Sequence, residues 1–253
     1  MIRTTARLAL MTVAAPTGTL RAQPDTSAWR LRVGPSFQSH SDLLASPFRQ
    51  HGIGLALGLE YRRGGLRMDL AGDAAGTSSA LLGEDRGTED VWNGGLAVAY
   101  VRSAGDVRGV TLRAGGGLAA LAFVRRHHYG PAASRDVFAD VVVPLSLVGE
   151  AATDVGASTG LRNRAEAGIV SLLFRSPFAG TKTQSLPEAG VAAPWDLVVV
   201  RNHLTLVRTL SASLRLTLEH GLTIYATDRS RRVRLLRQDV SVGLEWVPGR
   251  DEP

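Results

Sequence analysis

The feature that most constrains the fold is a strict alternation of apolar and polar residues near the end of the chain. Between Ser213 and Tyr225 the even positions are Leu, Leu, Leu, His, Leu and Ile, and the odd positions are Ser, Arg, Thr, Glu, Gly, Thr and Tyr. The segment from Asp239 to Val247 repeats the pattern. Successive side chains of a β-strand point to opposite faces, so each segment is predicted to be a strand with one apolar face. Strands of about 9–11 residues are long enough to cross a bilayer at a tilt.

The same alternation recurs along most of the chain and predicts an all-β fold with about ten strands, within a range of about eight to twelve. The predicted strands are about Ala28–His40, Gly52–Arg63, a strand beginning at Leu66, Val91–Arg102, Gly109–Arg126, Val137–Glu150, Gly160–Arg175, Trp195–Thr209, Ser213–Tyr225 and a last strand ending at Val247. Arg63-Gly64-Gly65 is predicted to be a tight turn. Pro144 removes a ladder donor in mid-strand, which predicts a bulge. The alternation after Trp195 shifts phase near Val199.

The links between these strands are alternately long and short. The odd-numbered links, such as the one before His51 and the one from Ser176 to Pro194, tend to be long and polar. The even-numbered links tend to be tight. Bacterial outer-membrane barrels have short periplasmic turns and longer outer loops, so the pattern predicts a single antiparallel up-and-down transmembrane barrel with both termini in the periplasm.

Alternation alone also fits a soluble periplasmic or secreted ligand-binding barrel with its apolar face inward. A membrane barrel is favoured because the polar rows are rich in small residues and mixed charges, which suit a narrow lumen. Aromatic residues also stand near the ends of the apolar rows, where the bilayer interfaces are expected: Trp29, Tyr61, Trp92 and Trp246. Barrel closure is expected to place Trp29 beside Trp246.

The N-terminus has the pattern of a secretory signal. Arg3 and Arg7 precede an apolar stretch, and Leu20-Arg21-Ala22 offers a cleavage site before Gln23. We therefore predict a signal peptide over residues 1–22, a barrel domain over residues 23–253, and Sec-type export. The net charge of +6 falls to +3 without the three signal arginines, so it does not indicate a nucleic-acid partner.

The last strand carries a resemblance to a known class of proteins. Ser241-Val242-Gly243-Leu244-Glu245-Trp246 resembles the terminal assembly signal of bacterial outer-membrane β-barrel proteins. The resemblance implies recognition by the barrel-assembly machinery, contact with outer-membrane lipids and a porin-like location in the outer membrane of a Gram-negative bacterium. Pro248 stands where an aromatic residue is usual, which departs from the pattern. The similarity covers only this strand, and no specific family is identified.

Candidates for catalysis gather where the first and third outer links meet the strands. They are Ser39, His40, Ser41, Asp42, His51, His127, His128 and Asp136. Acid with histidine activates water, and serine with histidine makes a nucleophile, so a protease or lipid hydrolase is one alternative. Their spacing does not differ from ordinary loop polarity, and we predict no catalytic residue, metal site or cofactor. The chain has no cysteine. His127 and His128 would share a metal ion only in a loop, because neighbours in a strand point apart.

The polar rows predict ion pairs between strands inside the lumen. The residues expected to take part are Glu60, Arg67, Asp69, Arg113, Arg201, Arg215, Glu219 and Asp239. Gly58 belongs to the same lumen-facing side, where a serine is expected to be tolerated. His220 falls in an apolar row, so we expect a bulge or a position near the outer headgroups. The predicted role is structural, interaction-bearing or narrowly pore-forming, with a lumen largely filled by charged side chains.

Overall fold

The structure is a computed structural model that describes residues 27–42, 46–79, 88–128, 137–176, 188–228 and 232–248. The predicted signal peptide and Asp136 lie outside the described residues. Within them every regular element is a β-strand, and no helix is long and apolar enough to cross a membrane. The predicted all-β class is confirmed.

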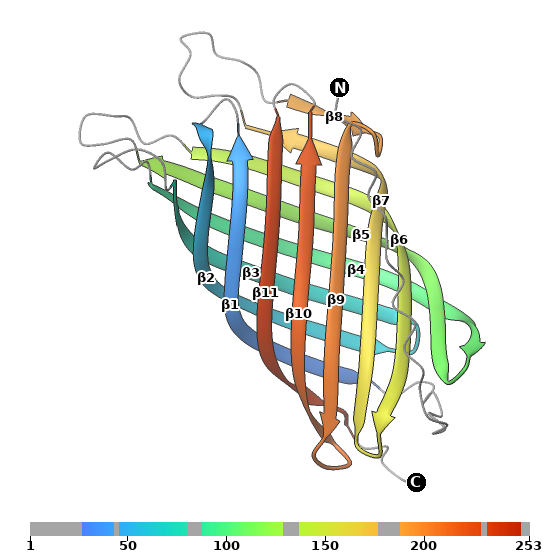
Figure 1. Cartoon of the computed structure of the whole chain (residues 1–253). Coiled ribbons are helices and arrows are strands. Elements are labelled where there is room, and N and C mark those ends of the chain that lie inside the picture. Colours follow the sequence, from blue (N-terminus) through green and yellow to red (C-terminus); the bar gives the residue numbers. More distant parts are fainter. Residues whose placement is uncertain are drawn as a thin grey trace.

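The strands form one closed antiparallel barrel (Figure 1). Their bounds are β1 (Ala28–Asp42), β2 (Ser46–Arg63), β3 (Leu66–Ser78), β4 (Thr88–Val107), β5 (Val110–His128), β6 (Val137–Gly156), β7 (Thr159–Arg175), β8 (Glu188–Ala192), β9 (Leu197–Thr209), β10 (Leu214–Thr227) and β11 (Val233–Trp246). The pairing of β1 with β11 and of β6 with β7 completes the ring. We call the end with the turns at 64–65, 108–109, 157–158 and 210–213 the short-turn end, and the opposite end the loop end.

Segments β8 and β9 together make a single strand of the barrel wall. β8 pairs with β7 near the loop end, and β9 pairs with β7 nearer the short-turn end. A turn over 193–196 separates the two segments, and the backbone N–H groups of Asp196 and Leu197 donate to the carbonyl of Ala193 there. The wall therefore has ten strands, as predicted. The phase shift lies in this turn rather than near Val199, and it leaves Trp195 85% exposed.

The apolar rows face outward and the polar rows face the lumen. In β1, Leu31 is 62% exposed on the outer wall, whereas Arg30 and Arg32 are buried inside. A soluble barrel would bury its apolar row instead. The outer wall is thus apolar, and the predicted assignment of faces is confirmed.

The seam of the barrel has the predicted register. Trp29 lies opposite Trp246, and Leu31 lies opposite Leu244. The ring of Trp29 also contacts that of Tyr61 on β2, with 4.6 Å between their centroids. Three aromatic residues therefore meet on the outer wall at the short-turn end, where an interfacial aromatic girdle is expected.

Two local irregularities lie where the sequence predicts them. Pairing of β6 with β7 shifts register between Leu145 and Ser146, next to Pro144, but the extra residue is Ile169 of β7 rather than a residue of the strand that carries the proline. Gly64 has φ 55°, a conformation that glycine adopts without the steric cost of a Cβ, and it makes the predicted tight turn to β3 possible.

The expectation for His220 was wrong. His220 faces outward in the middle of β10, and the strand pairs without a register shift on both sides. Neither a bulge nor a position at the strand end accommodates it. The adjacent strand β9 also presents a polar side chain outward. This is Asn202, whose side chain donates to Asn163 of β7 at 2.9 Å. The lipid-facing wall is therefore not uniformly apolar over β7, β9 and β10.

The guanidinium group of Arg32 packs over Gly58. A Cβ at this position would lie 2.6 Å from Nε of Arg32. Arg32 also forms an ion pair with Asp69 at 2.9 Å. A serine at Gly58 therefore requires the end of the Arg32 side chain to shift, and the expected tolerance of this substitution stays a prediction.

The outward row of β2 offers a test of the membrane-facing wall. Leu57 is 56% exposed near mid-strand, and His51 faces outward towards the loop end. Leu57→Arg is expected to lower the free energy of unfolding in lipid by about 2–4 kcal/mol, because a charge there meets the centre of the bilayer. His51→Arg places the same charge near the interface and should cost at most about 1 kcal/mol. Equal losses for the two variants, measured by denaturant unfolding in vesicles, would contradict the assignment.

Candidate functional site

The lumen is the candidate functional site, because its side chains carry nearly all of the buried charge. Its short-turn half is filled by arginines and carboxylates that come from opposite rows of the wall. Its loop half contains an apolar layer and a second, smaller polar cluster. The charged half, the apolar layer and the second polar cluster differ because the inward-facing residues of the strands differ along the barrel axis.

Glu245 of β11 is the first centre of the charged half. Its side chain is completely buried, and it forms ion pairs with three arginines from three other strands. Nη1 of Arg162 lies 3.2 Å and Nη1 of Arg215 2.9 Å from the carboxylate, and Arg62 contacts it as well. One negative charge is thus shared by three positive charges.

Glu60 of β2 is a second shared carboxylate. It pairs with Arg30, and its Oε1 lies 3.2 Å from both Arg62 and Arg67. Arg67 also reaches across the lumen to Glu150 of β6 at 2.7 Å. Arg62 therefore links the Glu60 and Glu245 centres into one network.

Glu219 of β10 joins the network from the far side of the seam. It lies 2.8 Å from Arg30, 3.5 Å from Arg32 and 3.0 Å from Nδ1 of His203. Arg201 of β9 lies 3.1 Å from Asp69. The buried charges are compensated, as burial in a low dielectric demands.

The predicted lumen pairing is confirmed for nearly all of its residues. Ion pairs between strands include Glu60, Arg67, Asp69, Arg201, Arg215 and Glu219. Asp239 pairs with Arg237 of its own strand, β11. Arg113 is the exception, because it forms no hydrogen bond or ion pair with a residue that the structure describes. Glu245, Arg30 and Arg162 were not predicted to take part, although all three stand at inward positions of their strands.

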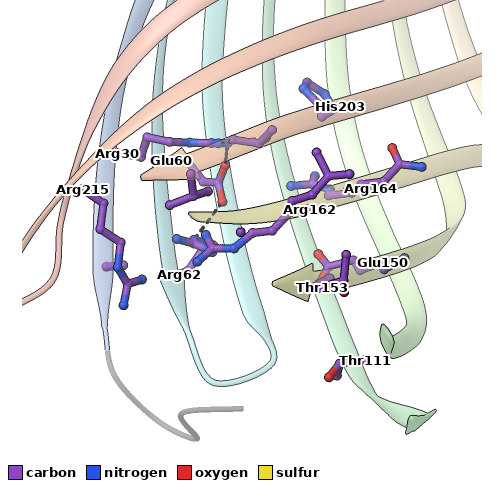
Figure 2. A pocket seen from close by; sticks show the side chains of 18 of the residues that line it. Arg30, Glu60, Arg62, Thr111, Glu150, Thr153, Arg162, Arg164, His203 and Arg215 are labelled. Atoms are coloured by element: carbon purple, nitrogen blue, oxygen red, sulfur yellow. Dashed lines mark hydrogen bonds and ion pairs between the residues drawn. The ribbon is translucent and has the colours of Figure 1, made fainter. Parts of the chain in front are cut away.

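A cavity of about 620 Å³ opens within this charged half (Figure 2). Residues of the short turns, including Gly64 and Ser158, line it, so it lies at the short-turn end. Arg162 extends across the space towards Arg62, and Glu150 and Thr153 lie on the other wall. Cavities of about 300–1,000 Å³ hold small molecules in other proteins.

An apolar layer lies in the lumen beyond the charged half. Its buried residues are Ala97, Ala119, Leu121, Phe123, Val142, Leu173, Ala192, Leu197, Val199, Tyr225, Val233 and Leu235. Phe123 of β5 stacks on Tyr225 of β10 with 5.0 Å between the ring centroids. These two strands are not neighbours in the barrel, so the stacked rings bridge the lumen.

The polar cluster at the loop end contains several of the residues considered for catalysis. Glu89 of β4 lies between His40 of β1 and His127 of β5, 2.5 Å from Nδ1 of His127. Arg125 lies 3.0 Å from Asp42. All five residues are at most 3% exposed. They are therefore packed side chains rather than groups that meet a substrate.

The remaining rim candidates do not join this cluster. Ser39 and His51 are opposite one another on the outer wall, and no hydrogen bond joins them. His128 also faces outward and pairs with Asp90 at 2.8 Å, so the adjacent histidines do point apart. Among the described residues no group of histidines and carboxylates has the geometry of a metal site.

Replacing Glu245 tests whether the network is structurally important. Glu245→Gln leaves Arg162 and Arg215 without their carboxylate partner, and we expect the free energy of unfolding to fall by about 3–5 kcal/mol. Asp228→Asn is the matched control, because Asp228 is 57% exposed and pairs with Arg232 and Arg234 outside the barrel wall. Hydrogen bonds from Arg234 hold the pKa of Asp228 below its usual value. The control should lose at most about 1 kcal/mol. A loss for Glu245→Gln no larger than the control's would show that the network adds no stability.

Comparisons with known proteins bear on the fold. No family model and no curated protein matches the sequence. The outer-membrane protease OmpT of Escherichia coli has a similar structure, with a TM-score of 0.52 and 7% identity over 91% of this chain and 99% of that chain. The β-domain of the Bordetella autotransporter Brka has 16% identity and a TM-score of 0.43 over 88% of this chain and 100% of that chain. At 7% identity, the similarity to OmpT shows shared architecture only. The chain has the fold of an outer-membrane β-barrel protein.

Proposed function

We propose that the chain is an outer-membrane barrel that is closed to passive diffusion and has a structural or interaction-bearing role. The observation that carries the proposal is the apolar layer in the loop half of the lumen. The stacked rings of Phe123 and Tyr225 cross the lumen there, and the ion pairs around Glu245 and Glu60 fill much of the other half. An open pore needs a continuous polar path, and these side chains interrupt it.

The proposed placement has the short-turn end in the periplasm and the loop end outside the cell. Short periplasmic turns and longer outer loops are the rule in bacterial barrels. Sec-type export, a Gram-negative source and recognition by the barrel-assembly machinery remain proposals that rest on the N-terminal pattern and on Ser241–Trp246. The segment Ser241–Trp246 lies in β11, which pairs with both β1 and β10 and so completes the wall.

The alternatives are less well supported. A narrow pore would have to pass the Phe123–Tyr225 pair. A hydrolase with its base in the lumen is disfavoured, because His40 and His127 are buried against Glu89. OmpT is a protease, but likeness of fold carries no activity over to this chain. A soluble ligand-binding barrel would not expose apolar rows of leucine on its outer wall.

Conductance in a planar bilayer tests the closed lumen. The wild-type chain is expected to insert without discrete current steps, because the apolar layer excludes ions. The double variant Phe123→Gly/Tyr225→Gly removes the rings that bridge the lumen and should conduct. Leu118→Gly, on the outward face of β5, is the matched control and should remain silent. Discrete conductance steps from the wild-type chain would overturn the proposal in favour of a pore.

A further inference from the structure

The cavity at the short-turn end has an excess of positive charge. Its lining contains eight arginines and four carboxylates. The carboxylates of Glu166, Glu219 and Glu245 stand behind that lining and pair with its arginines. Even with these three included, the arginines remain in the majority. The barrel wall excludes water and counterions on all sides but one, so the field of the excess charge is directed into the cavity.

The excess is concentrated around Glu245. Its carboxylate is fully buried, whereas the side chains of Arg162 and Arg215 are 30% and 22% exposed. Each of these two arginines contacts Glu245 through one Nη1 atom and has no other hydrogen bond or ion pair among the described residues. A guanidinium group carries five N–H donors. Most donors of both groups are therefore left for a partner that enters the cavity.

Two further observations place unmet donors at the same cavity. Nε of Arg30 and Nε of Arg164 are buried and have no hydrogen-bond partner among the described residues, although both residues line the space. Arg113 lines it from β5, also without an ion-pair partner in the described chain. An acceptor with several oxygens would satisfy donors that one shared carboxylate leaves open.

We propose that this cavity binds a compact, multiply charged oxyanion through Arg62, Arg162 and Arg215. Planar guanidinium groups match the paired oxygens of phosphate and carboxylate groups, and such charge-assisted hydrogen bonds are among the strongest in proteins. The volume of about 620 Å³ admits a molecule with more than one such group. Most of the polar side chains in the lining are charged, which selects an anion with several oxygens. The site goes beyond the proposed closed barrel, because it lies on the opposite side of the apolar layer from the loop end.

Titration calorimetry with inorganic pyrophosphate tests the site in the full chain, folded in an uncharged detergent at low ionic strength. One anion should bind per chain. Arg162→Gln/Arg215→Gln should weaken binding by about a hundredfold, since two charged donors are lost. The double variant keeps the ion pair between Arg62 and Glu245, so the buried carboxylate still has a partner. Citrate is the second probe, and it distinguishes a phosphate site from a site for oxyanions in general.

Two more variants keep the test decisive. Arg113→Gln breaks no ion pair among the described residues and should fold normally, yet it should weaken pyrophosphate binding roughly threefold through lost long-range attraction. Arg234→Gln changes an arginine outside the cavity and should leave the affinity unchanged. Absence of wild-type binding, or equal loss with Arg234→Gln and with the double variant, would overturn the proposal. Anion binding is measured in detergent and conductance in a planar bilayer, so a failure of the anion site can be distinguished from a failure of the closed barrel.

Discussion

The structure depends on the backbone hydrogen bonds that join each strand to two neighbours. In lipid an unpaired N–H or C=O group has no water to bind, so a sheet survives only as a closed ring. Closure here requires β1 to meet β11 and β6 to meet β7, and pairing along most of the length of these strands provides it. Once the ring is closed, the two-residue period of a strand fixes everything else: alternate side chains must meet lipid, and the others must share a narrow interior.

The narrow interior explains why charged side chains pack together in one part of the lumen and apolar side chains in another. Where the inward rows supply long charged side chains, arginines share carboxylates such as Glu245 and Glu60, since an uncompensated charge in this setting is costly. Where they supply apolar ones, the rows pack together as in any protein core, with Phe123 against Tyr225. The first arrangement leaves a charged cavity at the short-turn end, and the second forms an apolar layer in the loop half of the lumen.

Much of the fold was predictable because alternation is a local property of the chain. It located the strands, their faces and the Trp29–Trp246 register, and Pro144 lies next to a register shift whose extra residue is in the neighbouring strand β7. The sites were harder, because partners in the lumen depend on which strands face each other across it. Nothing in the sequence placed Glu89 between two histidines or three arginines on Glu245. The packing of the Arg32 guanidinium group over Gly58 was not predicted for the same reason.

Cross-linking at the seam tests barrel closure most directly, and the absence of native cysteine makes the result unambiguous. Cysteines replacing Trp29 and Trp246 stand at directly opposed positions of β1 and β11. Opposed residues in antiparallel strands have Cα atoms about 4.5–5.5 Å apart, within the span of a disulfide. Leu214 lies opposite Trp246 on β10, so Leu214→Cys/Trp246→Cys is the control for a pair within one hairpin. We predict that both pairs oxidise to disulfides in the folded chain. A disulfide in the hairpin control together with none at the seam would show that the barrel does not close between β1 and β11.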